Sequence, residues 1–445
     1  MTAEPLPGPL SAACIEVRPA TAGDAFAGVQ PLYVASPASV AEASAVMAAA
    51  AGLGLAVLPR GTGTRLAWGS PPRRCDLVVD TLRLDKVLEH EAGDLVARVQ
   101  AGVRMDELAG VLGSAGQQLS LDLPESPGAA RRAAGNGRGL AGRGRGTVGG
   151  VLATGAAGPR RLRYGTPRDL AIGYTVVLAD GTVAHSGGKV VKNVAGYDIG
   201  KLFAGSYGTL GLIAEAAFRL HPVPAAAAYV TRNCDGMAAA QEVTAAAAGS
   251  PLAPSAAEID RAARGGPVRV SVLLEGDKSG VAERSALLRK LLSGGASIAA
   301  DPPSWWGRSG LATAPDATLI RIAFWAGELA AVADALDAAA SAAGLDPLVG
   351  GSAAAGVIYA IVPGGAPAAA VADLVAALRS AGPLGQSGDD GPPSRGSVVV
   401  LQAPPEVRDA VDVWGPVPSA GLMRAVKDQF DPGHRMAPGR MPGGI

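Results

Sequence analysis

Short apolar runs between small or polar residues recur along the first half of the chain, and they predict an α+β fold. Strands are expected at residues 31–36, 55–58, 77–80, 87–91, 95–99, 171–178, 182–185 and 210–220. Helices are expected at residues 37–51, 105–112 and 198–203, the first with Ser39 as its N-cap. The triplets Ala92-Gly93-Asp94 and Ala179-Asp180-Gly181 each separate two strands, so they predict two hairpins.

The pattern changes near residue 223. Alanine-rich helical stretches at 236–248, 281–292, 329–343 and 368–381 alternate with short strands at 268–274, 318–324, 357–362 and 398–401. Four short strands with helices between them can pack as a split βαβ layer, with the helices on one face. We therefore expect a second domain at residues 223–420. A last helix at residues 421–430 ends at Asp431-Pro432-Gly433.

Two stretches have no such pattern. Residues 1–28 are rich in Ala, Pro and Gly and are expected to form a flexible N-terminus. Residues 124–146 contain five arginines and almost no large apolar side chain, so they cannot bury enough surface to offset the entropy of ordering. A mobile, solvated Gly/Arg-rich insertion is the favoured interpretation, and contact with nucleic acid or lipid is the alternative.

Charge and cysteine content exclude several classes of protein. The 39 basic and 39 acidic residues cancel, so no overall field attracts nucleic acid or a lipid surface. Three scattered cysteines are too few for a disulfide framework or a CxxC metal site. The N-terminus does not look like a signal peptide, and no apolar stretch is long enough to span a membrane. We expect a cytoplasmic protein, which meets a membrane only through partners.

The first candidate binding loop follows the strand at 55–58. Gly61 and Gly63 allow the backbone to turn so that consecutive N–H groups point into one concavity, which is a way to bind an anion. Thr62 and Thr64 add hydroxyl donors. Arg60 either adds positive charge or pairs with a nearby carboxylate. A tight turn without a ligand explains the same residues equally well.

The second candidate loop, at residues 147–155, has the sequence TVGGVLATG. Its small residues open a helix whose N-terminus is a natural site for a pyrophosphate. Close helix packing through glycine is the alternative. The overlapping GxGxxG at 144–149 follows the Arg/Gly-rich insertion and not a strand, so we reject a nicotinamide-binding Rossmann site.

Two further blocks, GGKVVKNVAGYD at 187–198 and GSYGTLGLI at 205–213, complete a recognisable order. The four blocks together resemble the FAD-binding domain of the vanillyl-alcohol oxidase/p-cresol methylhydroxylase (PCMH) superfamily. The last two look like those of the E-type FAD-binding subunits of glycolate oxidases. The resemblance covers about residues 30–222 and returns in KDQFDP at 427–432 and PGR at 438–440.

The resemblance implies a two-subdomain PCMH-type FAD-binding domain at residues 29–222. A ferredoxin-like α/β cap domain would follow at 223–420, and residues 421–445 would return to the FAD domain. The residues implied to bind FAD are Arg60, Gly61, Thr62, Gly63, Thr64, Thr147, Val148, Gly149, Gly150, Thr154, Gly155, Gly165, Arg168, Asp169, Gly211 and Ile213. Lys192, Asn193 and Tyr197 are candidates for the flavin edge, although structural roles are favoured for them.

Two departures from the family pattern concern the cofactor. Some members attach flavin through a histidine in the first loop, but Thr64 stands at the matching position and cannot form that bond. We therefore expect non-covalent FAD. Related D-lactate and glycolate dehydrogenase subunits carry a His/His/Glu metal cluster, whereas the four histidines here form no compact motif, so no metal site is expected.

By resemblance, the chain is expected to be an oxidoreductase subunit that oxidises a 2-hydroxy acid such as glycolate or D-lactate by hydride transfer to FAD. It would work beside a second FAD-containing subunit and an iron–sulfur subunit. Two alternatives are a self-sufficient FAD-dependent dehydrogenase of hydroxy acids or alcohols and a non-catalytic assembly subunit with an FAD fold. The sequence singles out no catalytic residue.

Overall fold

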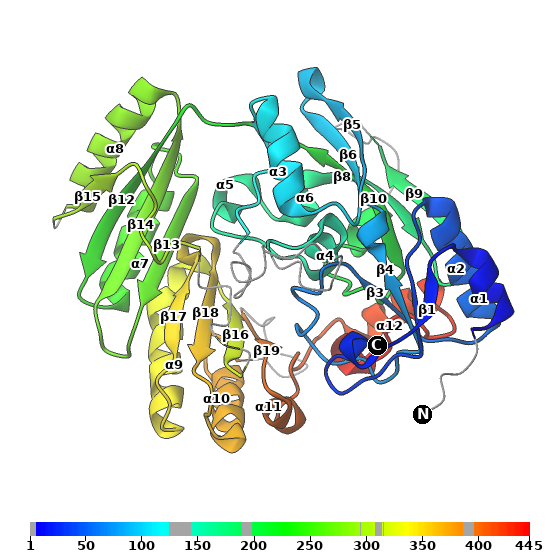
Figure 1. Ribbon diagram of the computed structural model, residues 1–445. Coiled ribbons are helices and arrows are strands. Elements are labelled where there is room, and N and C mark those ends of the chain that lie inside the picture. Colours follow the sequence, from blue (N-terminus) through cyan, green and yellow to red (C-terminus); the bar gives the residue numbers. More distant parts are fainter. Residues whose placement is uncertain are drawn as a thin grey trace.

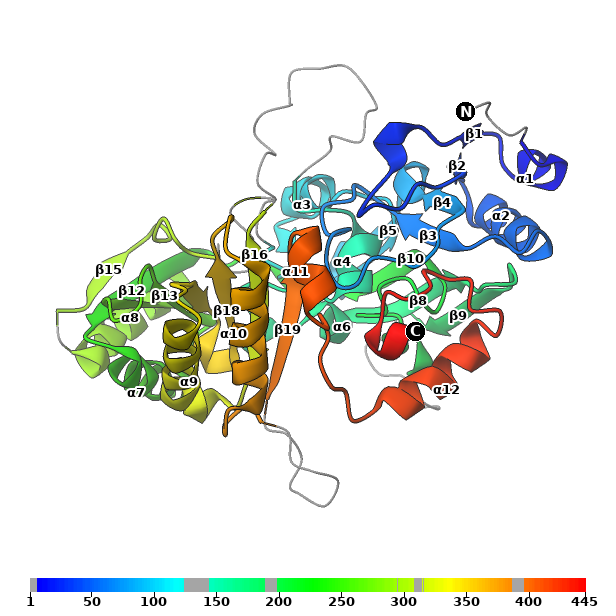
Figure 2. The same cartoon turned by 90° about the horizontal axis from the view of Figure 1, so that it is seen from below.

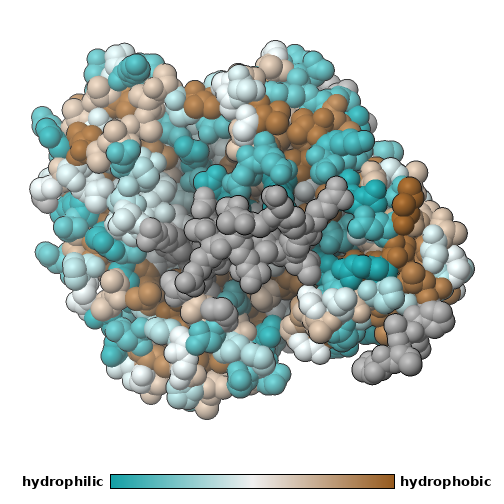
Figure 3. All heavy atoms as spheres, in the orientation of Figure 1, coloured by the Kyte–Doolittle hydropathy of each residue, from teal (hydrophilic) through white to brown (hydrophobic). Residues whose placement is uncertain are grey.

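The computed structural model describes residues 6–123, 144–188, 198–293, 295–307, 314, 316–385 and 396–445 (Figure 1). The insertion expected at 124–146 therefore lies almost wholly outside the described residues, as do Lys192, Asn193 and Tyr197. The described chain forms an N-terminal domain, a second domain built on one large sheet, and a C-terminal segment. On the face seen in Figure 3, hydrophilic and hydrophobic residues are interspersed over both domains.

The N-terminal domain contains a mixed four-stranded sheet with the order β1-β2-β4-β3. Its strands are β1 (Val17–Pro19), β2 (Tyr33–Ala35), β3 (Val57–Arg60) and β4 (Leu77–Asp80), of which β2, β4 and β3 run parallel. Helix α2 (Val40–Gly52) begins at Ser39, whose hydroxyl accepts a hydrogen bond from the Glu42 N–H. Its buried side chains pack on this sheet, together with Leu10 of α1 (Gly8–Ala13).

A second, antiparallel sheet of the same domain has the order β5-β6-β10-β8-β9. Its strands are β5 (Val87–Glu91), β6 (Val96–Gln100), β8 (Ala171–Val177), β9 (Val183–Gly187) and β10 (Leu212–Arg219). Four helices accompany it: α3 (Met105–Ser114), α4 (Val148–Thr154), α5 (Arg161–Tyr164) and α6 (Pro167–Leu170). Both predicted hairpins are present as β5–β6 and β8–β9. The expectation of two small sheets in an α+β domain is confirmed.

The second domain is one eight-stranded sheet with the order β15-β12-β14-β13-β17-β18-β16-β19. The strands are β12 (Ala226–Cys234), β13 (Ala256–Arg261), β14 (Val268–Gly276), β15 (Ser297–Ala299), β16 (Thr318–Ala323), β17 (Leu348–Gly351), β18 (Val357–Val362) and β19 (Ser397–Gln402). The helices are α7 (Met237–Ala248), α8 (Lys278–Leu292), α9 (Leu329–Ala342) and α10 (Ala368–Ser380). The chain runs βαββαβ twice, so two ferredoxin-like units meet edge to edge through β13 and β17.

The sheet of the cap domain is covered on one face by its helices and on the other by the N-terminal domain. Side chains that alternate along β16, β18 and β19 belong to two clusters: Ile320, Ile358 and Val400 pack with the helices, whereas Leu319 and Tyr359 pack with the N-terminal domain. The prediction of four cap strands was incomplete, because β12, β13, β15 and β17 were not recognised. The ferredoxin-like character of the domain is confirmed, and it occurs twice.

Both ends of the chain pack on the N-terminal domain. The expectation of a flexible segment at 1–28 was wrong for residues 6–28: Leu10 and Cys14 are buried against α2, and β1 pairs with β2. After α11 (Pro405–Ala410), helix α12 (Ala420–Phe430) leads into a tail whose Met436 forms a parallel bridge with Val57 of β3. Figure 2 shows this C-terminal segment on the side of the N-terminal domain.

Candidate functional site

A cavity lies between the two sheets of the N-terminal domain, and together with the open space at its mouth it measures about 740 Å³. The loop after β3 forms one wall, the start of α4 forms another, and the segment leading into β10 closes it. Eleven of the sixteen residues predicted to bind a cofactor line it: Arg60, Gly61, Thr62, Gly63, Thr64, Thr147, Gly149, Gly150, Thr154, Gly211 and Ile213. The tertiary fold thus brings together three sequence blocks that lie between residues 60 and 213.

The loop after β3 provides free hydrogen-bond donors. Within the described part of the chain, the backbone N–H groups of Thr62, Gly63 and Thr64 have no acceptor. Gly63 has φ +73°, a left-handed conformation that turns the chain so that successive N–H groups can converge. Three successive N–H groups at the wall of a cavity form an anion-binding concavity, which fits the pyrophosphate of a dinucleotide.

The two cofactor loops touch each other at Gly61. A Cβ atom at this position would overlap the hydroxyl oxygen of Thr147, so only glycine permits this approach. The same hydroxyl accepts a hydrogen bond from the Gly150 N–H at 3.3 Å and caps α4. The side chains of Arg60 and Thr147 are buried. The spacing between the two walls of the cavity is therefore fixed by direct contact.

The start of α4 differs from the sequence prediction. Its first three N–H groups already have partners: Val148 donates to the Val103 carbonyl, Gly149 to the Ala101 carbonyl, and Gly150 to Thr147. They are not free to hold a pyrophosphate. A Cβ at Gly149 would lie 2.8 Å from the Ala101 Cβ, so this glycine is required for close packing. Gly150 and Thr154 contribute surface to the cavity wall.

Five other predicted positions do not line the cavity. Val148 is buried in the core, and Gly155 ends α4 in a left-handed conformation with φ +62°. Gly165 and Asp169 belong to a local turn, in which Asp169 accepts hydrogen bonds from the N–H and hydroxyl of Thr166 at the start of α6. Arg168 is exposed on that helix. Their predicted cofactor contacts have no support in the geometry.

Two arginines that were not predicted also line the cavity, Arg65 and Arg440. Both are buried, and neither forms an ion pair with a carboxylate among the described residues. The Arg440 guanidinium donates to the carbonyls of Leu66 and Trp68, and that of Arg65 donates to the carbonyl of Arg145. The Nε atoms of both have no partner among the described residues.

Burial lowers the pKa of both guanidinium groups, to about 10 for each. Both remain charged at neutral pH, so the cavity holds two desolvated cations. Such charges are stabilised by an anion that enters the cavity. Each arginine has a signal in the sequence: Arg65 directly follows the first loop, and Arg440 belongs to the PGR motif at 438–440.

Tyr207 connects the cavity with the cap domain. It lines the cavity in a left-handed conformation with φ +54°, which is unusual for a non-glycine residue. Its ring packs edge-on against Trp414 and lies under the Arg440 guanidinium. At the boundary between the domains, Arg161 of α5 donates to the hydroxyl of Tyr359 in β18 at 3.1 Å. An arginine of the N-terminal domain and a tyrosine of the cap domain therefore meet at this boundary.

The histidines and cysteines lie elsewhere. His90 contacts Gln117, His185 contacts Thr175, the ring of His221 meets that of Tyr164 edge to face, and His434 contacts Asp428. The three cysteines are buried in hydrophobic clusters. Within the described residues, no His, Cys, Asp and Glu side chains gather into a metal-binding group, and no helix is long and apolar enough to cross a membrane.

Comparisons with known proteins agree with the interpretation of this cavity as a cofactor site. A family described as "FAD binding domain" matches residues 31–130 and 128–187. The glycolate oxidase subunit GlcD of Bacillus subtilis (strain 168) is 34% identical over 194 residues, which are 44% of this chain and 38% of that relative. The glycolate oxidase subunit GlcE of Escherichia coli (strain K12) is 32% identical over 157 residues, which are 35% of this chain and 40% of that relative. The chain thus spans less than half of the length of these relatives.

A solved structure extends the likeness of the fold to nearly the whole chain. An alkyldihydroxyacetonephosphate synthase superposes with a TM-score of 0.63 at 16% identity, covering 93% of this chain and 78% of that one. At this identity the match shows the fold alone. The matched family, the two cofactor loops and the cavity between them lead to one conclusion: residues 31–187 are similar to a family of FAD-binding domains, and FAD is the cofactor that this match indicates.

Proposed function

We propose that the chain is an FAD-dependent oxidoreductase that oxidises a 2-hydroxy acid, with FAD held non-covalently. One observation carries the proposal: a single cavity holds three backbone N–H groups and two buried guanidinium groups that, among the described residues, have no acceptor and no carboxylate partner respectively. The first feature fits the pyrophosphate of FAD. The second fits a further anion, and a 2-hydroxy acid brings a carboxylate.

Several residues would hold FAD. The amides of Thr62, Gly63 and Thr64 would bind the pyrophosphate, while Gly150 and Ile213 would border the cofactor through backbone surface. Non-covalent binding is supported by the cavity lining, because none of its described residues is a histidine or a cysteine. When bound, FAD supplies the acceptor for the hydride that leaves the substrate carbon.

The substrate side of the proposal rests on Arg65 and Arg440. A guanidinium group recognises a carboxylate through two parallel hydrogen bonds, and desolvation makes this interaction stronger than in water. Tyr207 and Tyr359 lie near these arginines, and Arg321 stands directly opposite Tyr359 in the cap sheet. These side chains would orient the acid and exclude water from the reacting atoms.

We further propose that the chain works in a complex with a second FAD-containing subunit and an iron–sulfur subunit. The two relatives named above are glycolate oxidase subunits, which supports an assembly of this kind. A chain with three cysteines cannot supply the four thiolates of a typical cluster, so a cluster would lie on a partner. A self-sufficient dehydrogenase remains the alternative.

The first experiment is the visible spectrum of the purified chain, before and after acid precipitation. Flavin that moves to the supernatant supports bound, non-covalent FAD. A yellow pellet would mean covalent attachment. A chain that stays colourless after incubation with FAD would refute the proposal and favour an assembly subunit.

The second experiment is an anaerobic titration with glycolate, D-lactate and a matched alcohol without a carboxylate. Bleaching of the flavin by the acids alone supports the substrate class, whereas bleaching by the alcohol at equal concentration contradicts it. Steady turnover of the isolated chain with an artificial electron acceptor would favour the self-sufficient enzyme. Reduction without turnover would favour the complex.

A further inference from the structure

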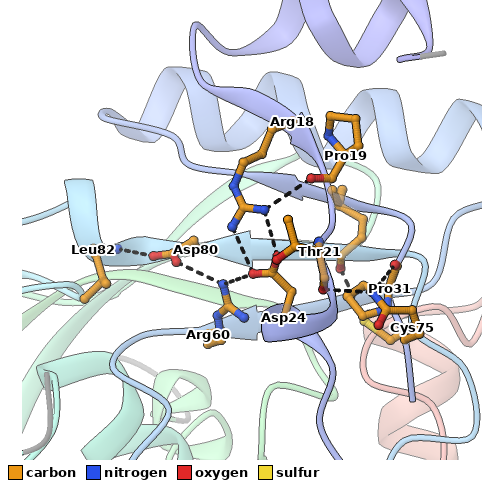
Figure 4. A network of polar contacts seen from close by, with 11 residues as sticks. Arg18, Pro19, Thr21, Asp24, Pro31, Arg60, Cys75, Asp80 and Leu82 are labelled. Atoms are coloured by element: carbon orange, nitrogen blue, oxygen red, sulfur yellow. Dashed lines mark hydrogen bonds and ion pairs between the residues drawn. The ribbon is translucent and has the colours of Figure 1, made fainter. Parts of the chain in front are cut away.

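Arg60 begins the first cofactor loop, yet its charge is directed away from a cofactor. Its guanidinium Nη2 lies 3.2 Å from Asp24 Oδ1 and 3.2 Å from Asp80 Oδ2. Only 3% of the Arg60 side chain is exposed. Figure 4 shows the guanidinium between these two carboxylates. The positive charge of Arg60 is therefore already compensated by protein groups, and its role in the loop is positional.

Asp24 is the centre of this network. Its Oδ2 accepts hydrogen bonds from the N–H and the hydroxyl of Thr21, both at 2.9 Å, and from Arg18 at 2.7 Å. Its Oδ1 accepts from Arg18 at 2.9 Å and from Arg60 at 3.2 Å. The side chain is fully buried, and the Arg18 hydrogen bond keeps the pKa of Asp24 well below its usual range.

The network joins the region that matches the FAD-binding family to a segment upstream of that region. Asp24 and Arg18 lie in the segment of residues 17–24, upstream of residue 31, where the family match begins. Arg60 is the last residue of β3 and precedes Gly61, which touches Thr147. A segment outside the matched family therefore sets the position at which the cofactor loop leaves the sheet.

The loop is held at this point from three directions. The Arg60 side chain is bound by Asp24 and Asp80, and the Arg60 carbonyl accepts a hydrogen bond from the Thr81 hydroxyl at 3.2 Å. Beyond Gly61, the N–H groups of Thr62, Gly63 and Thr64 lie at the cavity wall and have no acceptor among the described residues. Fixing the first residue of such a loop reduces the conformational entropy that is lost when a ligand binds.

We propose that residues 17–24 form an N-terminal strap that holds the pyrophosphate loop in its binding conformation, and that Asp24 is a positioning residue for FAD. Asp24 does not touch the cofactor. It acts through Arg60, and the strap contributes to FAD affinity by keeping the Arg60 guanidinium paired with carboxylates and the loop in place. The inference rests on the binding of FAD and is independent of the substrate.

The test compares Asp24→Asn with Asp337→Asn. Asp337 forms the same kind of two-point pair with a buried arginine, Arg261 at 2.6 and 2.7 Å, but it lies in the cap domain. FAD is removed from each full-length protein, and the dissociation constant of added FAD is measured by quenching of flavin fluorescence. The melting temperature of each protein without FAD is measured in parallel.

We expect Asp24→Asn to weaken FAD binding by at least about tenfold, which equals ~1.4 kcal/mol. Asp337→Asn should lower the melting temperature and leave FAD affinity within twofold of the wild type. Equal FAD affinity in the wild type and Asp24→Asn would overturn the proposal. Tighter binding by Asp24→Asn would also overturn it, because a released Arg60 would then bind the pyrophosphate directly.

Arg18→Gln keeps the proposal testable if Asp24→Asn does not fold. The Arg18 side chain is 44% exposed, so its replacement leaves the core intact while it removes two hydrogen bonds to Asp24. A smaller loss of FAD affinity in this variant supports the strap, and an unchanged affinity contradicts it. A wild-type protein that binds no FAD would instead refute the proposed function, so the two failures are distinguishable.

Discussion

A buried lysine fixes the C-terminal tail to the cofactor domain, and its replacement should separate the two. Lys427 of α12 donates from Nζ to the Thr209 carbonyl at 2.7 Å, to the Met436 carbonyl at 2.9 Å and to Asp431 Oδ2 at 2.6 Å. Both members of the ion pair have no exposed side-chain surface. Thr209 lies two residues before Gly211, which lines the cavity. We therefore expect Lys427→Met to affect both stability and FAD binding.

The size of the effect follows from what the substitution leaves behind. Methionine fills most of the space of the lysine stem, so the change removes the charge and three hydrogen bonds without a large cavity. Asp431 would stay buried without its cation, and such a loss costs about 3–5 kcal/mol. Burial lowers the pKa of Lys427, with hydrogen bonding to Asp431 acting in the opposite direction. The double variant Lys427→Met/Asp431→Asn removes the uncompensated charge and should recover part of the loss.

The assay is urea unfolding, which is monitored through the increase in flavin fluorescence on release of FAD. The midpoint and slope of the transition are determined for each variant. Lys201→Met is the control, because Lys201 forms a half-exposed pair with Asp198 at 3.4 Å. An exposed pair of this kind contributes at most about 1 kcal/mol. The reasoning is refuted if Lys427→Met shifts the midpoint no more than Lys201→Met does.

Three further outcomes test other parts of the site. Gly61→Ala should weaken FAD binding, because overpacking against Thr147 destabilises the loop by about 1–3 kcal/mol, and Gly61→Ala/Thr147→Ala should restore binding. The flavin-to-protein absorbance ratio measures the FAD content, and an unchanged ratio in the single variant would contradict the contact. Burial raises the pKa of Glu258 to about 8 from 4.5, so the folded chain binds the extra proton and stability falls as pH rises from about 4.5 to 8. This decline in the free energy of unfolding is at most ~5 kcal/mol, and Glu258→Gln should abolish it. Melting temperatures measured across that pH range test this, and an unchanged pH dependence in the variant would exclude Glu258 as the source. Arg65→Met should retain FAD but raise about tenfold or more the concentration of 2-hydroxy acid that bleaches half of the flavin. Arg163→Met is the control, because Arg163 makes only an exposed contact, and it should leave this concentration unchanged. Equal concentrations for the two variants would exclude a carboxylate site at Arg65.

The local part of the cofactor site was readable from the sequence. Glycine and threonine spacing at 60–64 and 147–155 identified two loops, and the fold places both at one cavity. The side chain that the pattern made most conspicuous, Arg60, is an ion-pair residue. No local rule connects it with Asp24, 36 positions upstream, because partners of this kind are selected by the tertiary fold. The first N–H groups of α4 were predicted to be free, but Val148 and Gly149 donate to carbonyls on the segment after β6 and Gly150 donates to the Thr147 hydroxyl.

The cap strands that were missed share a simple cause. β12 has the sequence AAAYVTRNC and β13 has AAEIDR, in which alanine and charged residues give low strand propensity. Nevertheless β12 pairs with β14 over nine residues, and β13 lies in the middle of the sheet. Burial between two neighbouring strands outweighs intrinsic preference there, so the duplication of the βαββαβ unit became visible only in three dimensions.

Residues from both terminal segments form side-chain contacts with the loops around the cavity. Asp24 binds the first residue of the loop at 60–64, Arg440 binds the carbonyls of Leu66 and Trp68 just beyond that loop, and Lys427 binds the carbonyl of Thr209. All three contacts come from outside the matched region of residues 31–187. A ligand that binds only the folded loops stabilises every contact that holds them. The proposed roles of these contacts would link FAD affinity to the docking of both terminal segments, and we expect a change that loosens either segment to weaken cofactor binding even though it touches no cofactor atom.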